Sequence, residues 1–282
     1  MKRLMNWHPG PGLKLALGLA PLLLLLIAYI WGSDLRLADN PNDKLMPEFG
    51  AFADAMQRLA FEPSKRSGDY LFWNDTLASL KRLGLGVGIS ALIGLVIGMI
   101  GGLLPYPRAS LTPLVTIVSL IPPMAILPIL FIIFGLGELS KVVLIALGIT
   151  PLLIRDLQSR VLEIPQEILV KAQTLGASTW QIALRVVLPQ ILPRLLEAVR
   201  LTLGTAWLFL IAAEAIAATE GLGYRIFLVR RYLSMDVILP YVAWITLLAY
   251  VTDWSLRSLS RLLFPWYFLQ PRRHLFKKVL TP

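Results

Sequence analysis

The sequence predicts an all-α integral membrane protein that crosses the bilayer with six helices. Of its 282 residues, 56% are hydrophobic and 16% are charged, whereas a soluble domain has about 25% charged residues. Apolar runs of about 20 residues recur along the chain, and a helix of that length crosses a hydrocarbon core of about 30 Å. A soluble protein of this length could not bury so much apolar surface.

The formal net charge of +10 indicates a membrane partner rather than nucleic acid. Lys and Arg cluster in short polar segments beside the apolar runs, as expected from the positive-inside bias and from anionic lipid headgroups. The chain has no Cys, which excludes a disulfide framework, a thiolate nucleophile and a Cys-bound metal. His8 and His274 lie near opposite ends of the chain, so we expect no metal site and no catalytic histidine.

The first apolar run covers about residues 15–31 and follows Lys2, Arg3 and Lys14. It lacks a small-x-small cleavage pattern, which favours an uncleaved anchor over a signal peptide. We therefore assign residues 1–31 to a cytoplasmic tip and a first transmembrane anchor.

Residues 32–72 are polar and richer in acids than in bases, which predicts a periplasmic insert. Within it, apolar residues at helical spacing indicate a short amphipathic helix against the membrane or the protein body. These residues are Phe49, Phe52, Met56, Leu59 and Ala60.

The second span, about residues 76–104, is rich in glycine. Gly94 and Gly98 form a G-x-x-x-G pair, a pattern that lets helix backbones approach closely. Near the outer end of this span, Arg82 could pair with Glu214 or bind lipid headgroups, and we favour the headgroups.

The third span, about residues 111–134, contains Pro122, Pro123 and Pro128. Proline removes a backbone donor, so the helix must bend or break there. Carbonyl groups freed at membrane depth are tolerated only inside protein or against a water-filled cavity. The break is therefore either a packing kink or a wall of a translocation path, for which Pro122 and Pro123 are candidates.

Three further spans are predicted at about residues 141–154, 198–218 and 239–263. Six crossings place both termini on the same side as the polar segment 155–195. Because that segment holds five basic residues and the tail at 268–282 holds four, this side should be the cytoplasm. Three arginines lie on the other side, against the rule: Arg225, Arg230 and Arg231.

Glu214 is the one acid well inside an apolar span. A charge near the bilayer centre costs about 2.5–3.5 kcal/mol on insertion scales, so Glu214 should face protein or a cavity. Two roles stay open: a structural partner such as a backbone amide or an arginine, or direct lining of the solute path. Gly221 and Gly223 follow in EGLGY, which fits a tight turn beside the path or a plain loop turn.

The polar segment after the fourth span contains two sets of apolar residues at helical spacing, which predict two short amphipathic helices. Gly176 lies between the sets and can adopt a positive φ, so it suits a turn that ends the first helix. Ser178 can cap the second helix, and Pro189 is expected to end it. The resulting apolar ridge could lie on lipid headgroups or fill a groove on a soluble partner.

This segment resembles the cytoplasmic loop of binding-protein-dependent ABC importer permeases, which has the form E-A-A-x3-G-x9-I-x-L-P. The family's leading Glu and first Ala are replaced here by Val170 and Lys171. Three other stretches resemble the nitrate/sulfonate/taurine-type permeases: TLASLKRLGLGVGIS at 76–90, SLIPPMAILPILFIIFGLGELSK at 119–141 and AWLFLIAAEAIAATEGLGYRI at 206–226. The likeness covers about residues 70–267.

The resemblance implies the six-helix, MetI-like fold of a type I ABC importer permease in the bacterial inner membrane. It assigns residues 73–267 to the permease domain, with the coupling loop at about 155–195, and leaves 268–282 as a cytoplasmic basic tail. It also implies that the loop contacts an ATPase subunit through eight residues: Val170, Lys171, Ala172, Gly176, Ala177, Thr179, Leu188 and Pro189.

The partners that the resemblance implies are two ATPase subunits, a periplasmic or lipid-anchored solute-binding protein and a second permease copy, with a homodimer expected. The chain contains no G-x-x-x-x-G-K-[ST] phosphate loop, so ATP and Mg²⁺ should be bound by the ATPase. We therefore expect a transport subunit without a cofactor and without enzymatic activity of its own.

Three other classes fit the sequence less well. An intramembrane enzyme needs a nucleophile–base pair, paired aspartates or an H-E-x-x-H site within the spans, and the sequence has none. Secondary transporters usually have internal repeats and several ionisable groups at mid-membrane depth, and a structural scaffold would not need the loop motif. The solute is expected to be nitrate, a sulfonate, taurine or bicarbonate, and a urea-like or guanidine-like nitrogen compound is the alternative.

Overall fold

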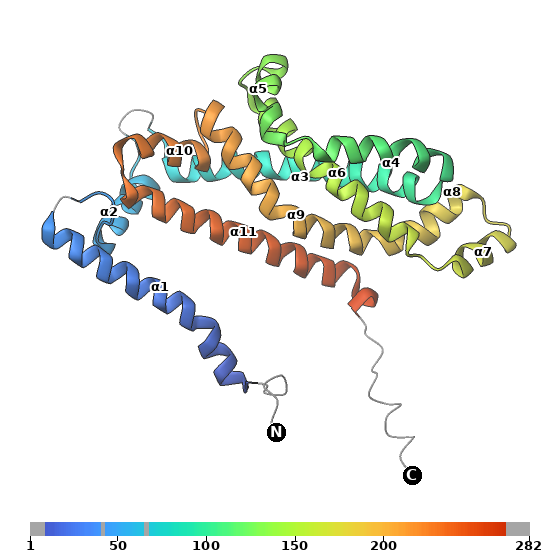
Figure 1. The fold of residues 1–282 in the computed structure, drawn as a ribbon, viewed down its shortest axis with the longest axis horizontal. Helices are drawn as coiled ribbons and strands as arrows, with labels where there is room; N and C mark the ends of the chain where they lie inside the picture. The colour runs from blue at the N-terminus through green and yellow to red at the C-terminus, as the bar shows by residue number, and fades with distance from the viewer. Residues whose placement is uncertain (1–8, 41–42, 65–67, 269–282) are drawn as a thin grey trace, which may run out of the picture. The chain divides into compact units, whose positions relative to one another are not determined.

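The computed structural model describes residues 9–40, 43–64 and 68–268. These residues are helical almost throughout (Figure 1). The α-helices are α1 (Pro11–Asp39), α2 (Phe49–Ala60), α3 (Leu71–Leu103), α4 (Pro105–Leu120), α5 (Pro123–Phe134), α6 (Glu138–Leu162), α7 (Gln166–Thr174), α8 (Thr179–Gln181), α9 (Leu188–Ala217), α10 (Leu222–Val229) and α11 (Met235–Leu263). A π-helix, η2 (Ile182–Val187), joins α8 to α9, and two short 3₁₀ turns are η3 (Arg230–Tyr232) and η4 (Pro265–Phe268).

Five helices in the described part of the chain are long and apolar enough to cross a membrane: α1, α3, α6, the continuous helix from Thr179 to Ala217, and α11. The pair α4 and α5 makes a sixth if its two arms count as one span. The arms meet at 94°, with Pro122 as the N-cap of α5 and Pro123 in its first turn. The prediction that the prolines bend or break the third span is confirmed (Figure 1).

The chain divides into two compact units. The first comprises described residues of 1–71 and 226–243, and the second comprises those of 72–225 and 244–268. In the first unit, the Tyr29 hydroxyl donates to the Pro47 carbonyl at 2.8 Å, and the Ser33 hydroxyl donates to the Met46 carbonyl at 2.9 Å. These bonds tie the end of α1 to the chain before α2.

Helix α2 occupies the stretch predicted to be amphipathic. Ala55 and Ala60 are buried on one face, and Phe52 is partly covered there and stacks at a tilt on Tyr29. The leucine-rich part of α1 is exposed instead, as expected of a helix that faces lipid.

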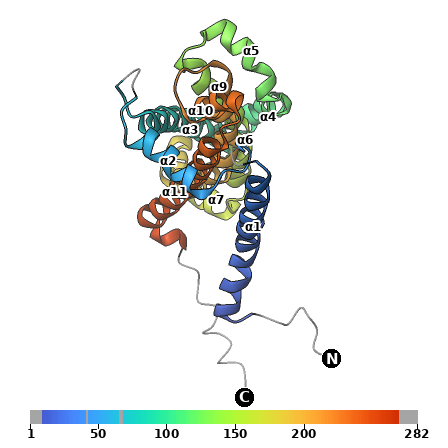
Figure 2. The ribbon, with the colours of Figure 1, turned by 90° about the vertical axis from the view of Figure 1, so that its left-hand side faces the viewer.

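The second unit is built around α6, which lies against both α3 and α9 (Figures 1 and 2). Glycines of α3 allow the close approach: a Cβ at Gly94 would lie 2.8 Å from the Leu153 Cβ, and one at Gly98 would lie 2.8 Å from the Leu157 Cβ. The predicted packing role of the G-x-x-x-G pair is confirmed.

Helix α6 is longer than the predicted fourth span of residues 141–154, so that boundary was wrong. The helix runs from Glu138 to Leu162 because its stripe of buried residues continues past Arg155, where the predicted span stopped. Leu153, Leu157 and Val161 recur at every fourth residue and are all buried, while the charged side chains between them point outward. Much of the predicted polar segment 155–195 therefore belongs to two long helices, the end of α6 and the start of the helix at 179–217.

Candidate functional site

Residues 166–189 form a compact two-helix unit, called here the 166–189 segment, which contains α7, α8, η2 and the first two residues of α9. Helix α7 ends at Thr174 with Leu175 as its C-cap, and Gly176 follows with a φ of +80°. The Ala177 N–H then donates back to the Ala172 carbonyl at 3.0 Å, which closes the turn. The predicted role of Gly176 is confirmed, because an L-residue with a side chain rarely adopts this conformation.

Ser178 caps the second helix of the segment, as predicted. Its hydroxyl accepts a hydrogen bond from the Gln181 N–H at 3.3 Å, and the Gln181 side chain accepts one from the Ser178 N–H at 2.8 Å. This reciprocal pair is a capping box, which satisfies backbone donors that a helix N-terminus leaves open. The turn and the start of α8 are thus held by bonds within the segment itself.

The prediction that Pro189 ends the second helix was wrong. Residues 179–217 are continuously helical, and Pro189 lies in the first turn of α9. The six residues of η2 before it form π turns, whose wider hydrogen-bonding ring accommodates an irregularity in the helix. The Gln190 side chain also donates to the Val186 carbonyl at 2.7 Å, and the helix continues past the proline.

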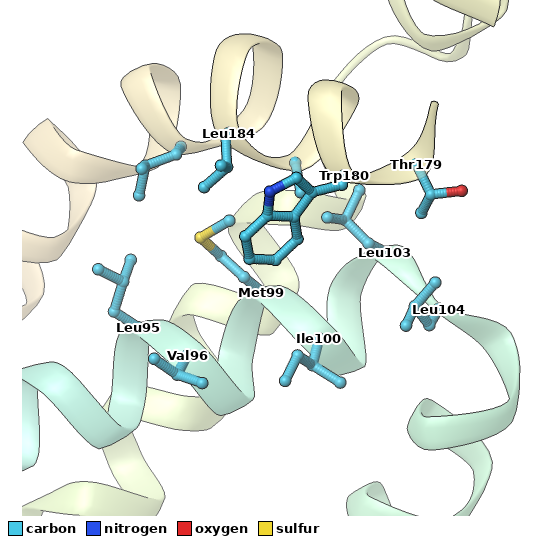
Figure 3. Close-up of a pocket in the computed structure, with 11 residues that line it drawn as sticks. Leu95, Val96, Met99, Ile100, Leu103, Leu104, Thr179, Trp180 and Leu184 are labelled. Carbon is cyan, nitrogen blue, oxygen red and sulfur yellow. The ribbon is translucent and has the colours of Figure 1, made fainter. Parts of the chain in front are cut away.

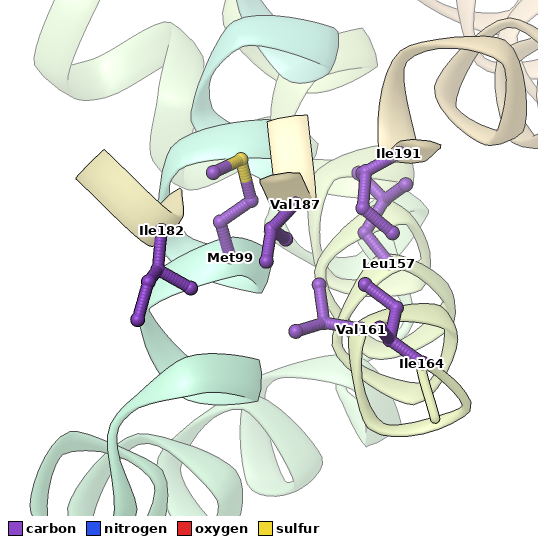
Figure 4. Close-up of a cluster of buried hydrophobic side chains, with 7 residues drawn as sticks. All are labelled: Met99, Leu157, Val161, Ile164, Ile182, Val187 and Ile191. Carbon is purple, nitrogen blue, oxygen red and sulfur yellow. The ribbon is translucent and has the colours of Figure 1, made fainter. Parts of the chain in front are cut away.

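One face of the segment belongs to the core of the second unit. Ile182 and Val187 of the segment, with Ile191 of α9 just after it, are buried against side chains of α3 and of the end of α6 (Figure 4). The partners in this cluster are Met99, Leu157, Val161 and Ile164. Of the predicted contact residues, Ala172, Ala177 and Leu188 pack against the same cluster.

The other face of the segment is uncovered. Helix α7 has no buried residue, and the apolar side chains of Ile168, Val170, Leu175 and Trp180 are 39%, 50%, 88% and 71% exposed. Among the predicted contact residues, Val170, Lys171, Gly176, Thr179 and Pro189 are exposed. One face of the segment is therefore packed on the core of the second unit, and the opposite face is an exposed apolar ridge formed by Ile168, Val170, Leu175 and Trp180.

Beside this ridge lies an apolar groove of about 320 Å³ between the segment and the C-terminal part of α3. The Trp180 indole points into it, toward Met99 and Leu103 (Figure 3). Leu184 and Leu188 line the same groove from the segment. The groove thus lies between the segment and α3, the helix whose other end carries the next group of residues.

At the opposite end of α3, charged and polar residues meet in what we call the Arg82 clamp: Asp75, Ser79 and Arg82 of α3, Glu138 of α6, Glu214 of α9 and the turn at 218–223, which includes the first two residues of α10. Arg82 is 1% exposed. Its guanidinium donates to both carboxylate oxygens of Glu138, to Glu214 Oε1 at 2.7 Å and to the Glu220 carbonyl at 2.8 Å. The favoured interpretation of Arg82 as a headgroup anchor was therefore wrong, since the pairing with Glu214 accounts for its burial.

Glu214 is fully buried in the clamp. Its carboxylate accepts from Arg82, from the Ser79 hydroxyl at 2.8 Å and from the Gly223 N–H at 2.9 Å. Both kinds of structural partner expected for this acid, an arginine and a backbone amide, are present. This matters because a buried carboxylate without such partners would be strongly destabilising.

The turn that follows α9 is fastened through its backbone. The N–H groups of Gly221, Leu222 and Gly223 donate to Asp75, Ser79 and Glu214, each at 2.9 Å. Asp75 also accepts from the Arg225 Nε at 2.7 Å, so one of the three arginines that opposed the positive-inside count has an acidic partner. Gly221 and Gly223 thus join Glu214 at one place, whereas Pro122 and Pro123 lie at the break between α4 and α5.

The sequence analysis missed Asp75, Ser79 and Glu138. A signal existed for the first two, because residues 75, 79 and 82 follow helical spacing and place three polar side chains on one face of α3. A further ion pair was not predicted either: Arg200 of α9 donates to both carboxylate oxygens of Asp253 of α11 at 2.9 Å. In the described part of the chain, no group of three or more Asp, Glu or His side chains could hold a metal ion.

Known proteins resemble this chain in sequence and in fold. Residues 92–265 match the family model of the binding-protein-dependent transport system inner membrane component. The taurine transport system permease protein TauC of Escherichia coli K12 is 38% identical over 199 residues, 71% of this chain and 72% of its own length. The bicarbonate transport system permease protein CmpB of Synechococcus elongatus is 33% identical over 200 residues, 67% of this chain and 71% of its own.

A third relative is the putative aliphatic sulfonates transport permease protein SsuC of Bacillus subtilis, 31% identical over 189 residues, 67% of this chain and 68% of its own. Among solved structures, the inward-facing MetNI methionine ABC transporter contains a chain that matches with a TM-score of 0.61 at 23% identity. That match covers 70% of this chain and 98% of the other. At that identity the structural match shows a shared fold.

Proposed function

The chain belongs to the binding-protein-dependent transport system inner membrane components, the permease subunits of ABC importers, and we propose that it conducts a small oxyanion across the membrane. As a permease it is the non-catalytic transmembrane component and carries no cofactor of its own. Membership implies that it works with an ATPase and a solute-binding protein.

We propose that the 166–189 segment is the seat of the ATPase subunit, and the observation that carries this is its uncovered ridge. The ridge has no buried residue in α7 and exposes Leu175 and Trp180, yet the turn beneath it is fixed by its own hydrogen bonds. A rigid helical ridge with apolar anchors is the form in which a helix fills a groove on a partner. ATP-driven closure of that partner would move the segment and, through the buried cluster behind it, α3, α6 and α9.

We also propose an orientation, with the segment and both termini in the cytoplasm. The basic residues of 155–195 and of the tail support it, because cytoplasmic loops carry an excess of Lys and Arg. The Arg82 clamp, at the other end of α3, then lies toward the periplasm. There the solute-binding protein would deliver its cargo to a path formed with a second copy of this chain.

The solute class rests on the relatives. Taurine, aliphatic sulfonates and bicarbonate are named for three of them, and all three solutes are small and carry an oxyanion. Arg82 does not supply the selectivity, because four of its five N–H groups already bind the chain's own oxygens. We therefore propose that the binding protein selects the solute.

The seat of the ATPase is tested by Leu175→Asp in the purified complex. Leu175 is 88% exposed, so the substitution should leave the fold within about 0.5 kcal/mol of the native stability. Placing a carboxylate in an apolar groove should weaken ATPase association about tenfold to a hundredfold, or about 1.4–2.8 kcal/mol. The measurement is co-purification and titration of the ATPase subunit onto the permease in nanodiscs.

The matched control is Phe61→Asp, which alters an apolar residue that is 72% exposed and lies in the first unit after α2. It should bind the ATPase as the native chain does. Equal affinity of Leu175→Asp and native permease would place the seat elsewhere. A native permease that never associates with a nucleotide hydrolase would refute the importer proposal itself.

The solute is tested by calorimetric titration of the cognate binding protein with taurine, an alkanesulfonate, nitrate and bicarbonate, followed by uptake into proteoliposomes. Binding and ATP-dependent uptake of at least one of them is the expected result. If none binds, the proposed solute class is wrong while the permease assignment stands.

A further inference from the structure

We propose that Arg82 is a positioning residue of the transport cycle. It holds the turn at 218–223 against α3, α6 and α9, so that the turn and the adjoining ends of these three helices move as one rigid block. This inference rests on the proposed importer function and adds to it a part that neither binds solute nor touches the ATPase. Three features of the Arg82 clamp support it: the saturation of the guanidinium, the number of elements it joins and the way the turn is fastened.

The guanidinium is saturated by the chain. Arginine has five N–H donors, and four of them bond to Glu138, Glu214 and the Glu220 carbonyl. The Glu220 carboxylate lies 3.6 Å from Nη2. A passing anion would have to displace a carboxylate from a side chain that is 1% exposed, so the role of Arg82 is to hold protein rather than solute.

The bonds of Arg82 join elements that are far apart in the chain. Arg82 itself lies in α3, Glu138 opens α6, Glu214 lies near the end of α9, and Glu220 is in the turn after α9. A bidentate arginine–carboxylate pair such as that with Glu138 fixes orientation as well as distance. Each element is therefore held at a defined place relative to the other three.

The turn cannot relax around the clamp. Gly221 has a φ of +125°, and a Cβ there would lie 2.6 Å from the Glu214 Cδ and 2.7 Å from the Arg82 Nη1. Three successive backbone N–H groups of the turn are bound by side chains of α3 and α9. The turn is thus packed directly on the ion pair, and its shape depends on that pair.

It follows that the ends of α3, α6 and α9 at the clamp keep one arrangement through the cycle. The change between states must then take place elsewhere in the second unit. Two irregular places are available, the break between α4 and α5 and the π-helix η2, and π-helices inside longer helices often mark functional sites.

The test compares Arg82→Met with Lys81→Met in complexes reconstituted with the ATPase and the binding protein. Lys81 is the neighbouring residue on α3 and is exposed, so its variant removes one positive charge at the same depth without touching the clamp. Solute imported per ATP hydrolysed should fall about fivefold or more in Arg82→Met and stay at the native value in Lys81→Met. A purely structural role would lower the amount of complex and leave this ratio unchanged.

Arg82→Lys should give an intermediate ratio, because lysine keeps the charge but cannot bind Glu138 with two parallel bonds. Should Arg82→Met fail to fold, Glu138→Gln keeps the experiment decisive. The Glu138 side chain is 60% exposed, so its neutralisation weakens the clamp without leaving a buried acid unpaired.

A second readout does not require transport. Because the chain has no Cys, spin labels at Leu139→Cys and Thr219→Cys report the distance from α6 to the turn by pulsed electron resonance. One narrow distance is expected in the native chain, with and without trapped ATP, and a broad distribution is expected in Arg82→Met. Unchanged distances and an unchanged import ratio in Arg82→Met would overturn the clamp alone, whereas absence of uptake by the native complex would overturn the proposed function.

Discussion

In the Arg82 clamp, bonded partners come from distant parts of the chain: Arg82 and Glu214 are 132 residues apart, and Asp75 and Arg225 are 150 apart. In the 166–189 segment, the capping box joins residues three apart, Ser178 and Gln181. The clamp is buried and depends on several elements at once. The segment holds its own shape locally and leaves its apolar side chains exposed.

This difference suits the Arg82 clamp and the 166–189 segment to different tasks. A local structure can be offered to a partner without being remade when the partner binds, and pre-organisation of this kind lowers the entropic cost of association. A structure held by long-range ion pairs instead resists local change, because removing one buried partner leaves the other charge uncompensated. Between the clamp and the segment, the proposed coupling requires the buried stripe of α6 to carry the movement, since packed interiors shift between discrete arrangements rather than deform.

The largest expected effect comes from breaking the local turn with Gly176→Pro. Proline fixes φ near −65°, whereas Gly176 has a φ of +80° and its N–H donates to the Gln173 carbonyl at 2.9 Å. The ridge should lose its shape, and ATP-driven uptake should fall by about 90% or more because the segment no longer fits its partner. Membrane insertion and the spin-label distance at the clamp should remain native.

Gly176→Asn is the matched variant, because asparagine tolerates the left-handed region and a Cβ at this position meets no atom within 4 Å. It should keep most of the uptake. Uptake that survives Gly176→Pro would show that the turn is not part of the coupling, and a clamp distance altered by that variant would show that the two ends are not independent.

The next effect in size is on stability, from Gly223→Ala in the clamp. A Cβ at Gly223 would lie 2.6 Å from the Ile211 carbonyl oxygen and 3.0 Å from the Glu214 Cβ, and a backbone atom cannot move aside. We expect a loss of about 1–3 kcal/mol, typical of overpacking, measured as thermal unfolding of the purified permease in detergent.

Gly204→Ala in α9 is the control, since a Cβ there meets nothing within 4 Å. It should be neutral or stabilising by up to about 1 kcal/mol, because alanine favours helix over glycine. If both variants unfold at the native temperature, the turn is looser than the hydrogen bonds of its backbone indicate.

The same contrast between local and distant contacts explains what the sequence could predict. The break at Pro122, the turn at Gly176 and the cap at Ser178 depend on the chemistry of a few neighbouring residues, and all three were predicted. The pairing of Arg82 with Glu214 was only the less favoured of two alternatives, because nothing local distinguishes an arginine that meets a lipid headgroup from one that meets an acid 132 residues away. The class of the protein was readable because composition and the loop motif are likewise properties of the sequence alone.

Two errors had other causes. The fourth span was cut short because a charge at Arg155 was taken as a membrane boundary, whereas the buried face of α6 continues to Val161. Pro189 was expected to end a helix because proline usually does so. The π turns of η2 that let the helix continue have no sequence signature of comparable strength, so this feature requires the structure.

The smallest expected effect is that of Tyr267→Phe, at an exposed counterpart of the clamp near the segment. The Tyr267 hydroxyl donates to Glu197 at 3.1 Å, and its ring lies 4.9 Å below the Arg194 guanidinium, which itself pairs with Glu197 at 3.3 Å. Phenylalanine keeps the ring contact and loses one hydrogen bond, so the stability should fall by about 0.5–1 kcal/mol or less. Tyr106→Phe, at a side chain that is 91% exposed, should have no effect.

The dependence on pH separates this bond from mere packing. Burial raises the pKa of the Tyr267 hydroxyl above its ordinary value of about 10, so the folded chain favours the protonated donor. The contribution of Tyr267 is then complete below that ordinary value and is lost as the pH rises through the folded-state pKa. Thermal unfolding of the native chain and of Tyr267→Phe should therefore differ at pH 8 and converge in strong alkali. A difference that persisted there would show that the effect of Tyr267→Phe does not come from the hydrogen bond that the protonated hydroxyl donates to Glu197.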